Sequence, residues 1–467
     1  MENTRKLNSS SLLEHVGSVL SPVLPAGGSI VTGLSGGVDS VVLLHLLNQL
    51  SPKYSWRLSA LHVHHGISPH ADTWAELCTN LCAQYKIPLQ IEHVNIAPLR
   101  DMGIEAAARK LRHQALARQP ADVIALAHHL DDQAETLLLQ LLRGAGVRGA
   151  SAMPTIRSDN SPLVVRPLLD VPRSELIAYA QQHQLQWVED ESNADDNYPR
   201  NFLRHRVLPL LEQKFPAYRD TLARSARHFA EASELLDDLA RLDAPDLFTS
   251  PAGGRGARGE GDVFLLKISH LQSLFPARAK NLLRYYLHSS GAPLPQAVQL
   301  DDMLQQLCGA RQDAEVCIAY GGWQVRRYQG RIYVLLALGE FDLNYVLRWS
   351  GQPELDWPPL NTRLQFKSSQ GAGISGEKLQ RAPVTLRLRQ GGESLRPHPN
   401  AATRTLKNLL QEHEILPWQR DRLPLLYCGD ELVCVPNVAA AAEYQAGQGE
   451  PGIVVLILPP VSHKPVA

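Results

Sequence analysis

Long apolar runs are missing from this sequence of 467 residues. Its longest apolar stretches, residues 41–47 and 137–142, are interrupted by polar residues and are far shorter than the roughly 20 residues that a membrane-spanning helix needs. The first ten residues, Met1 to Ser10, also lack the apolar core of a signal peptide. We therefore expect a cytoplasmic protein without a membrane-spanning segment.

Cysteine is scarce, and the six residues at positions 78, 82, 308, 317, 428 and 434 include no Cys-x-x-Cys pair. This spacing excludes a dense disulfide framework and predicts reduced thiols. Cys78 and Cys82 share a helical face and could contribute to a metal site. Because no second Cys or His pair lies nearby in the sequence, a buried apolar role is the favoured interpretation.

An excess of either charge is also missing, because 46 Lys and Arg residues balance 47 Asp and Glu residues to a net charge of -1. Two segments nevertheless depart from this average. One runs from Arg381 to Lys407 and contains a single acid, Glu393; the other contains Arg200, Arg204, Arg206, Arg219, Arg224 and Arg227. Basic clusters are usually solvated surfaces, so charge alone makes nucleic-acid binding the less favoured of two interpretations.

The most informative segment is Ser35-Gly36-Gly37-Val38-Asp39-Ser40. It follows a partly β-branched run, residues 29–34, that predicts a strand, and it precedes residues 41–50, whose apolar side chains recur at helical spacing. The glycines let backbone N–H groups approach an anion, the helix N-terminus offers unpaired donors, and the serines add hydroxyls. We predict a pocket for the phosphates of ATP; the alternative is an ordinary glycine-rich turn capped by Asp39.

A Walker-type NTPase is disfavoured, because the sequence has no Gly-x-x-x-x-Gly-Lys-Ser/Thr motif and the loop has no lysine to reach a β- or γ-phosphate. The loop instead resembles the PP-loop of the N-type ATP pyrophosphatases, whose members split ATP into AMP and pyrophosphate. This resemblance implies that a carbonyl-like oxygen is activated by adenylation. Asp39 cannot attract phosphate itself, so it would hold a metal ion or cap the helix.

Strand and helix patterns alternate regularly after this loop. The expected strands cover residues 58–64, 89–94 and 122–127, and the expected helices cover residues 72–85, 104–118 and 131–142. Such alternation predicts an α/β fold with right-handed crossovers and a parallel sheet covered on both faces. Ligands of such sheets bind beyond the carboxyl ends of the strands, where every motif described here falls.

The rest of the chain predicts smaller units. We expect an ATP-binding catalytic domain at residues 1–215, a helical linker at 216–245, a middle domain at 246–340 and a β-rich C-terminal domain at 383–460. The pattern turns helical from about Pro172, most clearly at residues 199–211 and 218–242, and the Pro- and Gly-rich residues 351–376 are expected to separate the last two domains. Residues 251–261 hold five glycines and two arginines; they could touch RNA, but a solvated linker is favoured.

Three acidic residues, Asp131, Asp132 and Glu135, open the helix that follows His128 and His129. Asp132 and Glu135 are three residues apart, so both carboxylates project to one side of the first turn. The helix dipole favours acids there in any case. Because the other face of this helix is apolar and the turn is expected beside the phosphate loop, we favour a site that holds Mg²⁺ or an ammonium group.

Arginines could complete this site. Arg109 and Arg112 follow Glu105 at helical spacing on the preceding helix. They form either a surface ion-pair ladder, worth about a few tenths of a kcal/mol per pair, or a pair of donors to ATP phosphates or to a substrate carboxylate. The arginines at 200, 204 and 206 are similarly either one helix face or ligand contacts.

Five segments together resemble the tRNA(Ile)-lysidine synthetase family. They are Ser35–Ser40, His62-Val63-His64-His65-Gly66, Ile104-Glu105-Ala106-Ala107-Ala108-Arg109, His128–Thr136 and Glu189-Asp190-Glu191-Ser192-Asn193. The resemblance covers about the first 215 residues. It extends more weakly to Leu416-Pro417-Trp418-Gln419-Arg420-Asp421 and to Leu423-Pro424-Leu425-Leu426.

The resemblance implies an α/β parallel-sheet PP-loop ATPase domain of the adenine nucleotide alpha hydrolase-like type, followed by a helical connector and two smaller α+β C-terminal domains. It implies a ligase that attaches L-lysine to the wobble cytidine of the isoleucine tRNA with a CAU anticodon. ATP and Mg²⁺ would be the cofactors, and an adenylated tRNA would form before AMP is released. The C-terminal domains would bind the tRNA, and the oligomeric state is left open, with a homodimer as one option.

The resemblance also assigns roles to the candidate residues. The ATP-binding residues would be Ser35, Gly36, Gly37, Val38, Asp39 and Ser40, and the catalytic residues would be Asp39, Arg109, Arg112, His128, Asp132 and Glu135. Among these, Asp39 and Asp132 would hold Mg²⁺, Arg109 or Arg112 would neutralise developing charge, and His128 would lie near the transferred phosphate. Glu135 would bind or deprotonate the lysine ammonium group. Arg200, Arg204 and Arg206 would position either the tRNA or the lysine carboxylate.

Alternatives remain open at this point. Another PP-loop enzyme would share the fold, but a tRNA thiolase usually shows reactive cysteine pairs and an amidotransferase-coupled synthetase an ammonia-supplying domain. Neither feature is evident in the sequence. A non-catalytic tRNA-binding protein would not need Asp39, Asp132 and Glu135 together beside an intact loop.

Overall fold

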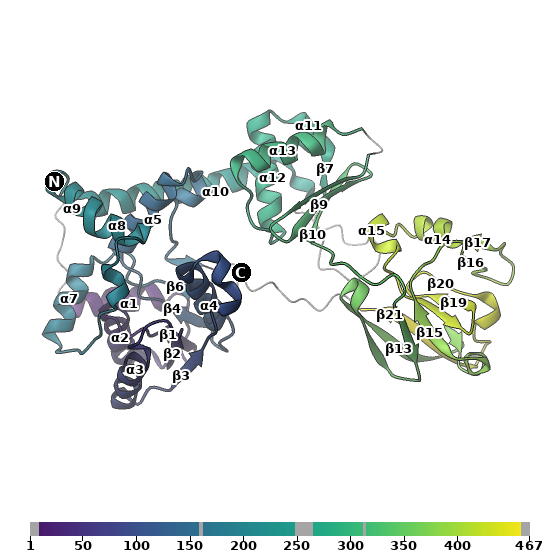
Figure 1. The fold of residues 1–467 in the computed structure, drawn as a ribbon, viewed down its shortest axis with the longest axis horizontal. Helices are drawn as coiled ribbons and strands as arrows, with labels where there is room; N and C mark the ends of the chain where they lie inside the picture. The colour runs from purple at the N-terminus through teal and green to yellow at the C-terminus, as the bar shows by residue number, and fades with distance from the viewer. Residues whose placement is uncertain (1–8, 158–161, 248–264, 312–313, 459–467) are drawn as a thin grey trace. The chain divides into compact units, whose positions relative to one another are not determined.

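The structure is a computed structural model that describes residues 9–157, 162–247, 265–311 and 314–458 (Figure 1). The Gly- and Arg-rich residues 251–261 lie outside the described residues. The chain divides into two compact units between Leu236 and Asp237. The helix predicted at the expected linker is present as α10 (Tyr218–Asp243), which runs across this division.

The first unit alternates strands and helices, as predicted. Its strands are β1 (Ser29–Gly33), β2 (Arg57–His64), β3 (Leu89–His93), β4 (Val123–Ala125), β5 (Ile156–Arg157) and β6 (Leu163–Val165). Its main helices are α1 (Ser9–Leu20), α2 (Val38–Tyr54), α3 (Ala71–Tyr85), α4 (Ile104–Ala117), α5 (Leu130–Leu142), α6 (Val147–Ala150), α7 (Arg173–Gln182), α8 (Pro199–Phe202) and α9 (Leu208–Lys214).

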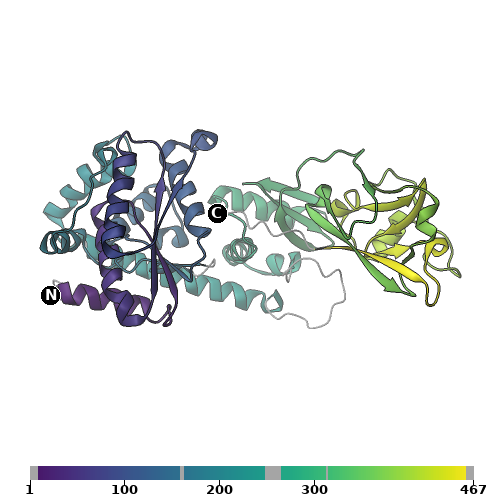
Figure 2. The ribbon, with the colours of Figure 1, turned by 90° about the horizontal axis from the view of Figure 1, so that it is seen from below.

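These strands form one sheet in the order β3-β2-β1-β4-β6-β5, and the strands are parallel except that β5 is antiparallel to β6. Because side chains alternate along a strand, Ile30 of β1 packs with α2 while Val31 packs with Leu116 of α4. Helices therefore cover both faces of the sheet (Figure 2). This confirms the predicted α/β fold and puts the carboxyl ends of the parallel strands at one edge.

The helical segment predicted at residues 199–211 is confirmed, but it is not one regular α-helix. The chain forms α8, then a π-helical turn at Leu203–Val207, then α9. In the π turn the N–H of Leu208 donates to the carbonyl of Leu203, five residues back. Pro209 lacks an N–H and its ring crowds the preceding turn, so a regular α-helical register cannot pass through this point.

The second unit starts with helices and an antiparallel sheet. The helices are α11 (Ile268–Ser273), α12 (Pro276–Ser289) and α13 (Ala297–Gly309), and the strands are β7 (Leu266–Lys267), β8 (Val316–Tyr320), β9 (Trp323–Tyr328) and β10 (Arg331–Leu336) in the sheet order β7-β10-β9-β8. Leu282 and Leu287 of α12 pack with Val325 and Ile332 of the sheet. Apart from the short strand β7, the described part of the middle domain expected at residues 246–340 is thus helical at first and β-structured from Val316.

A β-rich part follows. Its strands are β11 (Val346–Trp349), β12 (Glu354–Trp357), β13 (Thr362–Gln370), β14 (Ile374–Ser375), β15 (Val384–Arg387), β16 (Ser394–Leu395), β17 (Arg404–Thr405), β18 (Leu425–Cys428), β19 (Glu431–Val435), β20 (Ala439–Ala440) and β21 (Pro451–Ile457), with helices α14 (Leu406–Glu412) and α15 (Pro417–Arg420). The two main sheets have the orders β11-β15-β18-β19-β20 and β12-β13-β21-β14.

The interpretation of residues 351–376 as separating sequence is wrong. They contain β12, β13 and β14, and β13 pairs with β21, so that Phe366 lies opposite Val455. Leu364 and Phe366 point into the core, and Arg363 and Lys367 are exposed. The Pro and Gly residues at the ends of these strands obscured this alternation in the sequence.

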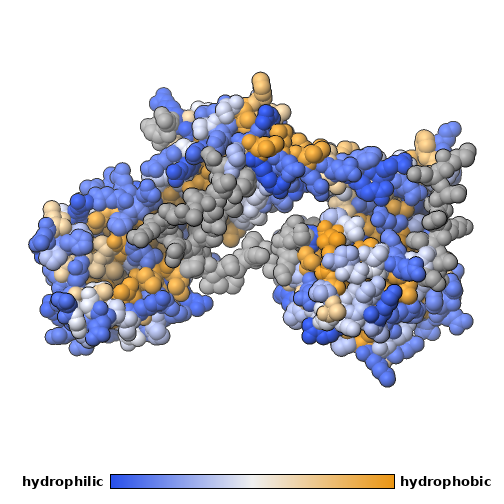
Figure 3. Space-filling model, turned by 180° about the vertical axis from the view of Figure 1, so that it is seen from behind, coloured by the Kyte–Doolittle hydropathy of each residue, from blue (hydrophilic) through white to orange (hydrophobic). Residues whose placement is uncertain are grey.

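All six cysteines are free, and Cys78 and Cys82 are buried in the core that α2 and α3 share, which confirms their apolar interpretation. Within the described ranges, every helix is too short or too polar to cross a bilayer. Hydrophilic side chains cover most of the surface that is visible from behind, and apolar side chains gather in a few patches (Figure 3).

Candidate active site

The phosphate loop is a tight turn between the end of β1 and the start of α2. Ser40 Oγ donates to the carbonyl of Gly37 at 2.9 Å and accepts from the N–H of Ser35 at 3.2 Å. Gly36 has a φ of +89°, a conformation that glycine adopts without strain. Gly37 precedes α2 and has no side chain with which to cap it, so N–H groups of the first turn are left for an anion.

His129 caps the acidic helix α5. The N–H of Asp132 donates to His129 Nδ1 at 3.3 Å, and the N–H of His129 donates to Asp132 Oδ2 at 3.1 Å. Such reciprocal bonds fix the first turn of a helix. Burial alone would lower the pKa of His129, but the negative charges of Asp132, Asp39 and Asp131 outweigh burial and raise it.

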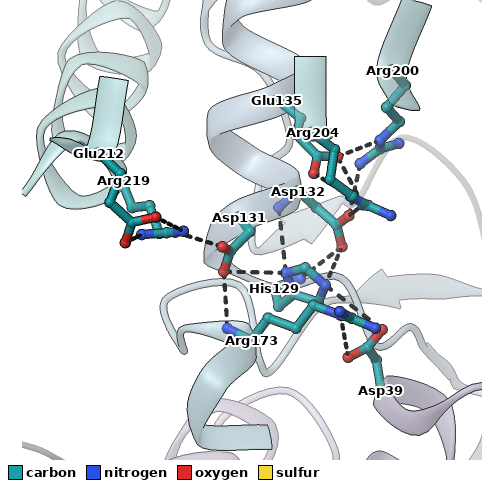
Figure 4. A network of polar contacts seen from close by, with 10 residues as sticks. All are labelled: Asp39, His129, Asp131, Asp132, Glu135, Arg173, Arg200, Arg204, Glu212 and Arg219. Carbon is teal, nitrogen blue, oxygen red and sulfur yellow. Dashed lines mark hydrogen bonds and ion pairs between the residues drawn. The ribbon is translucent and has the colours of Figure 1, made fainter. Parts of the chain in front are cut away.

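The phosphate loop and the acidic turn meet at this histidine, as the sequence predicted. His129 Nε2 lies 3.7 Å from Asp39 Oδ2 and 3.4 Å from Asp132 Oδ2 (Figure 4). Arg173 Nε lies 3.6 Å from Asp39 Oδ1, a buried atom that has no hydrogen-bond partner in the described part of the chain. Asp39 therefore keeps an oxygen that can still accept a ligand.

Two arginines hold the acidic turn. Arg200 donates through Nε to Glu135 at 2.7 Å and through Nη2 to Asp132 at 2.8 Å. Arg204 donates through Nε to the other oxygen of Glu135 at 2.7 Å (Figure 4). The Glu135 side chain is only 1% exposed. Burial would lower the pKa of both guanidinium groups, but the two carboxylates raise it, so the arginines stay charged.

Arg200 and Arg204 reach the same carboxylates because they lie about one helical turn apart. Arg200 belongs to α8 and Arg204 to the π turn, four residues later. Arg206 points elsewhere: its Nε donates to Asp196 at 2.8 Å, and its side chain is 69% exposed. The structure thus brings Arg200 and Arg204 into the site and leaves Arg206 outside it.

Asp132 is ionised in this environment. Its burial would raise the pKa of the carboxyl, but the positive charges of His129 and Arg200 lower it below the ordinary value. Asp39 and Asp132 together offer carboxylate oxygens, the ligands that Mg²⁺ prefers. Within the described residues, no cluster of three or more His, Cys, Asp or Glu side chains could hold a metal ion. Two carboxylates nevertheless suit Mg²⁺, which commonly takes one or two carboxylates and completes its coordination with substrate phosphates and water.

His128 directly precedes His129 after the end of β4. Its Nδ1 is buried and has no hydrogen-bond partner in the residues that the structure describes. Burial, then the positive charges of Arg166, Arg200 and Arg109, lower the pKa of His128 to about 3 although Asp132 opposes them. This imidazole is therefore neutral at physiological pH.

Arg109 and Arg112 both lie on α4, which covers the opposite face of the sheet from α2. Their positive charges reach His128 and His65, respectively, and contribute to the lowered pKa values of these histidines, after burial. The side chain of Glu105 is outside the described part of the structure. Arg109 and Arg112 therefore border the strand ends from the α4 face.

Sequence reasoning missed two arginines of this network, Arg173 and Arg219. Arg173 opens α7 beside Asp39, Asp131 Oδ2 accepts from the N–H of Arg173 at 2.9 Å, and Arg219 of α10 donates to Asp131 Oδ1 at 2.6 Å. Arg173 and Arg219 are far from the loop in the sequence, and each looks like an ordinary helix-start or surface arginine. The signal that could have found Arg173 is its position directly after Pro172, at a helix start.

Comparisons with known proteins give the following results. Residues 11–211 match the family model described as PP-loop domain, residues 266–333 match the TilS substrate binding domain, and residues 384–457 match the TilS substrate C-terminal domain. Curated proteins named tRNA(Ile)-lysidine synthase are similar over most of their length.

Three of these relatives show the range of similarity. The protein from Nitrosomonas europaea is 42% identical over 92% of both chains. The protein from Azoarcus sp. is 41% identical over 91% of both chains. The protein from Coxiella burnetii is 38% identical over 94% of this chain and 95% of its own.

Proposed function

Because the chain belongs to the tRNA(Ile)-lysidine synthase family, we propose that its active site joins the ε-amine of L-lysine to the wobble cytidine of an isoleucine tRNA with a CAU anticodon. The protein is a ligase that uses ATP to form lysidine on tRNA(Ile). One observation supports the assignment of the site above all: His129 contacts both Asp39 of α2 and Asp132 of α5. The phosphate-binding loop and the acidic turn therefore serve one reaction centre.

The loop residues Ser35–Ser40 would hold the ATP phosphates. The N-terminus of α2 supplies N–H donors and a positive dipole end, and Ser35 and Ser40 supply hydroxyls close to the same anion. Asp39 and Asp132 would hold Mg²⁺. When bound, Mg²⁺ supplies positive charge that neutralises the phosphate oxygens.

The first step activates the base. The C2 oxygen of cytosine is a poor leaving group, so it attacks the α-phosphorus of ATP; the bond from that phosphorus to the bridging oxygen breaks, and pyrophosphate leaves. Arg109 or Arg112 would stabilise the charge that develops on the phosphate, as a planar guanidinium group can. His128, neutral because of its lowered pKa, would lie near the transferred phosphate.

The second step forms the new C–N bond. The lysine ε-amine attacks C2 of the adenylated base, the C2–O bond breaks, and AMP leaves. With an ordinary pKa of about 10.4, the amine is mostly protonated at neutral pH and must first lose a proton. Glu135 would bind the ammonium group or accept that proton. Since Arg200 and Arg204 occupy Glu135 in this structure, the ammonium group would displace one of them, which could then bind the lysine carboxylate or a tRNA phosphate.

A sulfur-transfer reaction is not favoured by the cysteines of this unit. Burial raises the pKa of Cys78 to about 12 and of Cys82 to about 11, so both thiols are protonated and poor nucleophiles. The free state of all six cysteines agrees with a site of action in the cytoplasm, where thiols stay reduced.

Labelled lysine, ATP and tRNA transcripts that differ only at the wobble base test the proposed reaction. Label should enter only the transcript that carries cytidine at this position. Asp132→Asn should abolish incorporation while the protein stays folded. The matched control is Asp220→Asn, which removes an exposed carboxylate from the first turn of α10 and should leave incorporation unchanged. Near-normal turnover of Asp132→Asn would rule out the role of Asp132.

The role of Arg204 can be tested separately. Arg204→Ala should raise the KM for lysine or for tRNA, and Arg206→Ala, whose side chain pairs with Asp196 outside the site, should change neither. An Arg204→Ala variant with unchanged KM values and unchanged kcat would contradict both proposed contacts.

A further inference from the structure

Arg166, directly after β6, is buried beside the active site without full pairing. Its side chain is 7% exposed; Nη1 donates to the carbonyl of Pro154 at 2.8 Å, while Nε is buried and has no hydrogen-bond partner among the described residues. A buried guanidinium N–H that lacks a partner costs free energy. Arg166 stands at the carboxyl end of β6, next to the carboxyl end of β4, where this fold binds its ligands.

Strand register places a second arginine beside it. In the antiparallel pair β5–β6, Arg157 lies opposite Val164, and the N–H of Arg166 bonds to Thr155. Because side chains alternate, Arg157, Val164 and Arg166 share one face of the sheet. Val164 packs against the apolar cluster of β4 and α4, so this is the face that α4 covers.

α4 adds two more arginines on the same face. Its His113 has a pKa lowered to about 4, first by burial and then by the positive charges of Arg109, Arg112, Arg166 and Arg157. Burial and the charges of Arg157 and Arg109 also lower the pKa of Arg166 to about 10, and no described carboxylate is among the groups that shift it. Arg109 and Arg112 are exposed to solvent, and Asp190 partly compensates Arg112. Arg166 is buried with its Nε unpaired within the described ranges, so its charge is the one that a bound anion would stabilise most.

We propose that Arg166 and Arg157, with the arginines of α4, form a phosphate-binding site under α4 at the carboxyl edge of the sheet. Phosphate is the chemical class that fits, because a planar guanidinium group binds two phosphate oxygens at once. This inference rests on the proposed function, because the two substrates of that reaction are the two sources of phosphate. They are the tRNA backbone and the pyrophosphate part of ATP.

The test uses the full-length protein and three labelled probes: pyrophosphate, ATP and a tRNA transcript. Arg166→Gln should weaken binding of at least one probe roughly tenfold, the scale of one lost charge-assisted contact. Weaker binding of pyrophosphate and ATP would identify the nucleotide as the source, and weaker binding of tRNA alone would identify the RNA backbone. The matched control is Arg57→Gln at the exposed start of β2, on the amino edge of the sheet, and it should bind all probes as the unmodified protein does.

Two further variants keep the proposal open to refutation if the buried Arg166→Gln variant does not fold. Arg157→Gln changes a partly exposed residue and should weaken the same probe, whereas Arg166→Lys keeps the charge and should retain part of the affinity. Unchanged binding of all three probes by folded Arg166→Gln or by Arg157→Gln would overturn the site. Lysidine formation by the unmodified protein is measured in parallel, so that failure of the proposed function is recognised independently of pyrophosphate binding.

Discussion

Glu135 is the single residue whose charge matters most to the folded active site. Both of its oxygens accept hydrogen bonds from arginines in a setting that excludes water. Glu135→Gln keeps the shape but removes the carboxylate that both arginines share, so that Asp132, with Asp39 acting on Arg204, is left to compensate them. Breaking a buried pair in this way costs about 3–5 kcal/mol, so we expect the free energy of unfolding, measured with urea, to fall by that amount.

The control for this prediction is Arg206→Gln. The Arg206–Asp196 pair is exposed to solvent, and such pairs are worth about 0–1 kcal/mol. If Glu135→Gln lowered the unfolding free energy no more than Arg206→Gln does, the buried pairing seen at Glu135 would not exist in solution.

His113 should make stability depend on pH. In the unfolded chain its pKa is near 6.5, whereas in the folded protein burial, followed by the arginine charges, lowers it to about 4. Folding therefore opposes protonation: the contribution of His113 to stability is complete above pH 6.5 and declines as the pH falls toward 4. His113→Gln should flatten the dependence of the unfolding free energy on pH between 6.5 and 4. An unchanged slope would contradict the lowered pKa.

Site residues could be predicted from the sequence where the local pattern around them already showed a strand followed by a helix. Asp39, Asp132 and Glu135 were predicted to lie together, and they do, because Asp39 and Asp132 belong to the first turns of helices that follow parallel strands and Glu135 lies three residues beyond Asp132 on α5. Arg166 could not be predicted, since its significance arises only when β6 is placed against β4; for Arg173 the sequence signalled a helix start, but not that α7 packs beside Asp39 of α2. Local spacing contains no record of that placement.

At the scale of single elements, the phosphate loop requires glycine at position 36 chiefly because of the backbone conformation there, and less because a side chain would lack space. A Cβ there would lie 3.0 Å from Val188 Cγ2, and the φ of +89° disfavours any L side chain. Gly36→Ala should therefore cost about 1–2 kcal/mol of unfolding free energy and weaken ATP binding, as calorimetry would show.

Gly37→Ala is the matched control for the loop. The φ of Gly37 is −72°, and the nearest atom to an added Cβ is Ser35 Oγ at 3.6 Å, so the fold should tolerate the methyl group. Any effect of Gly37→Ala should appear in ATP affinity rather than in stability. Equal losses of stability in both variants would show that the left-handed backbone at Gly36 is not what the loop requires.

Element boundaries show which local signals are sufficient. The strands β1 to β4 and the helices α2 to α5 were predicted to within a few residues because period and turn residues agree there, whereas α1, β5 and β6 were not predicted. The helix at 199–211 was predicted without its π turn, because apolar periodicity marks a helical segment but does not show that the bond from Leu208 spans five residues ahead of Pro209. The strand β13 was missed because the composition of residues 351–376 was considered as a whole. The glycines and prolines of the turns dominate that composition and hide the clear alternation of buried and exposed residues within β13.

At the scale of the whole chain, the near-zero net charge is accompanied by ion pairs between basic and acidic side chains. The basic segment that ends at Lys407 is largely matched by acids close in space: Arg389 lies near Glu393, Arg396 near Glu443, and Arg404 near Glu412. A polyanionic tRNA would therefore meet fewer uncompensated cations here than the sequence suggests. Phosphate contacts should come from residues such as Lys407, which is exposed on α14.

The dependence of tRNA binding on salt measures these contacts. The logarithm of the association constant should fall linearly with the logarithm of salt concentration, by a slope of about 0.9 for each phosphate neutralised. Lys407→Gln should weaken binding and reduce the slope by about 1. Lys53→Gln, at the exposed end of α2 away from the phosphate loop, should change neither quantity. If binding of tRNA did not weaken between low and moderate salt, phosphate contacts would not supply its affinity. The basic segment that ends at Lys407 would then be an ordinary solvated surface whose arginines pair with nearby acids.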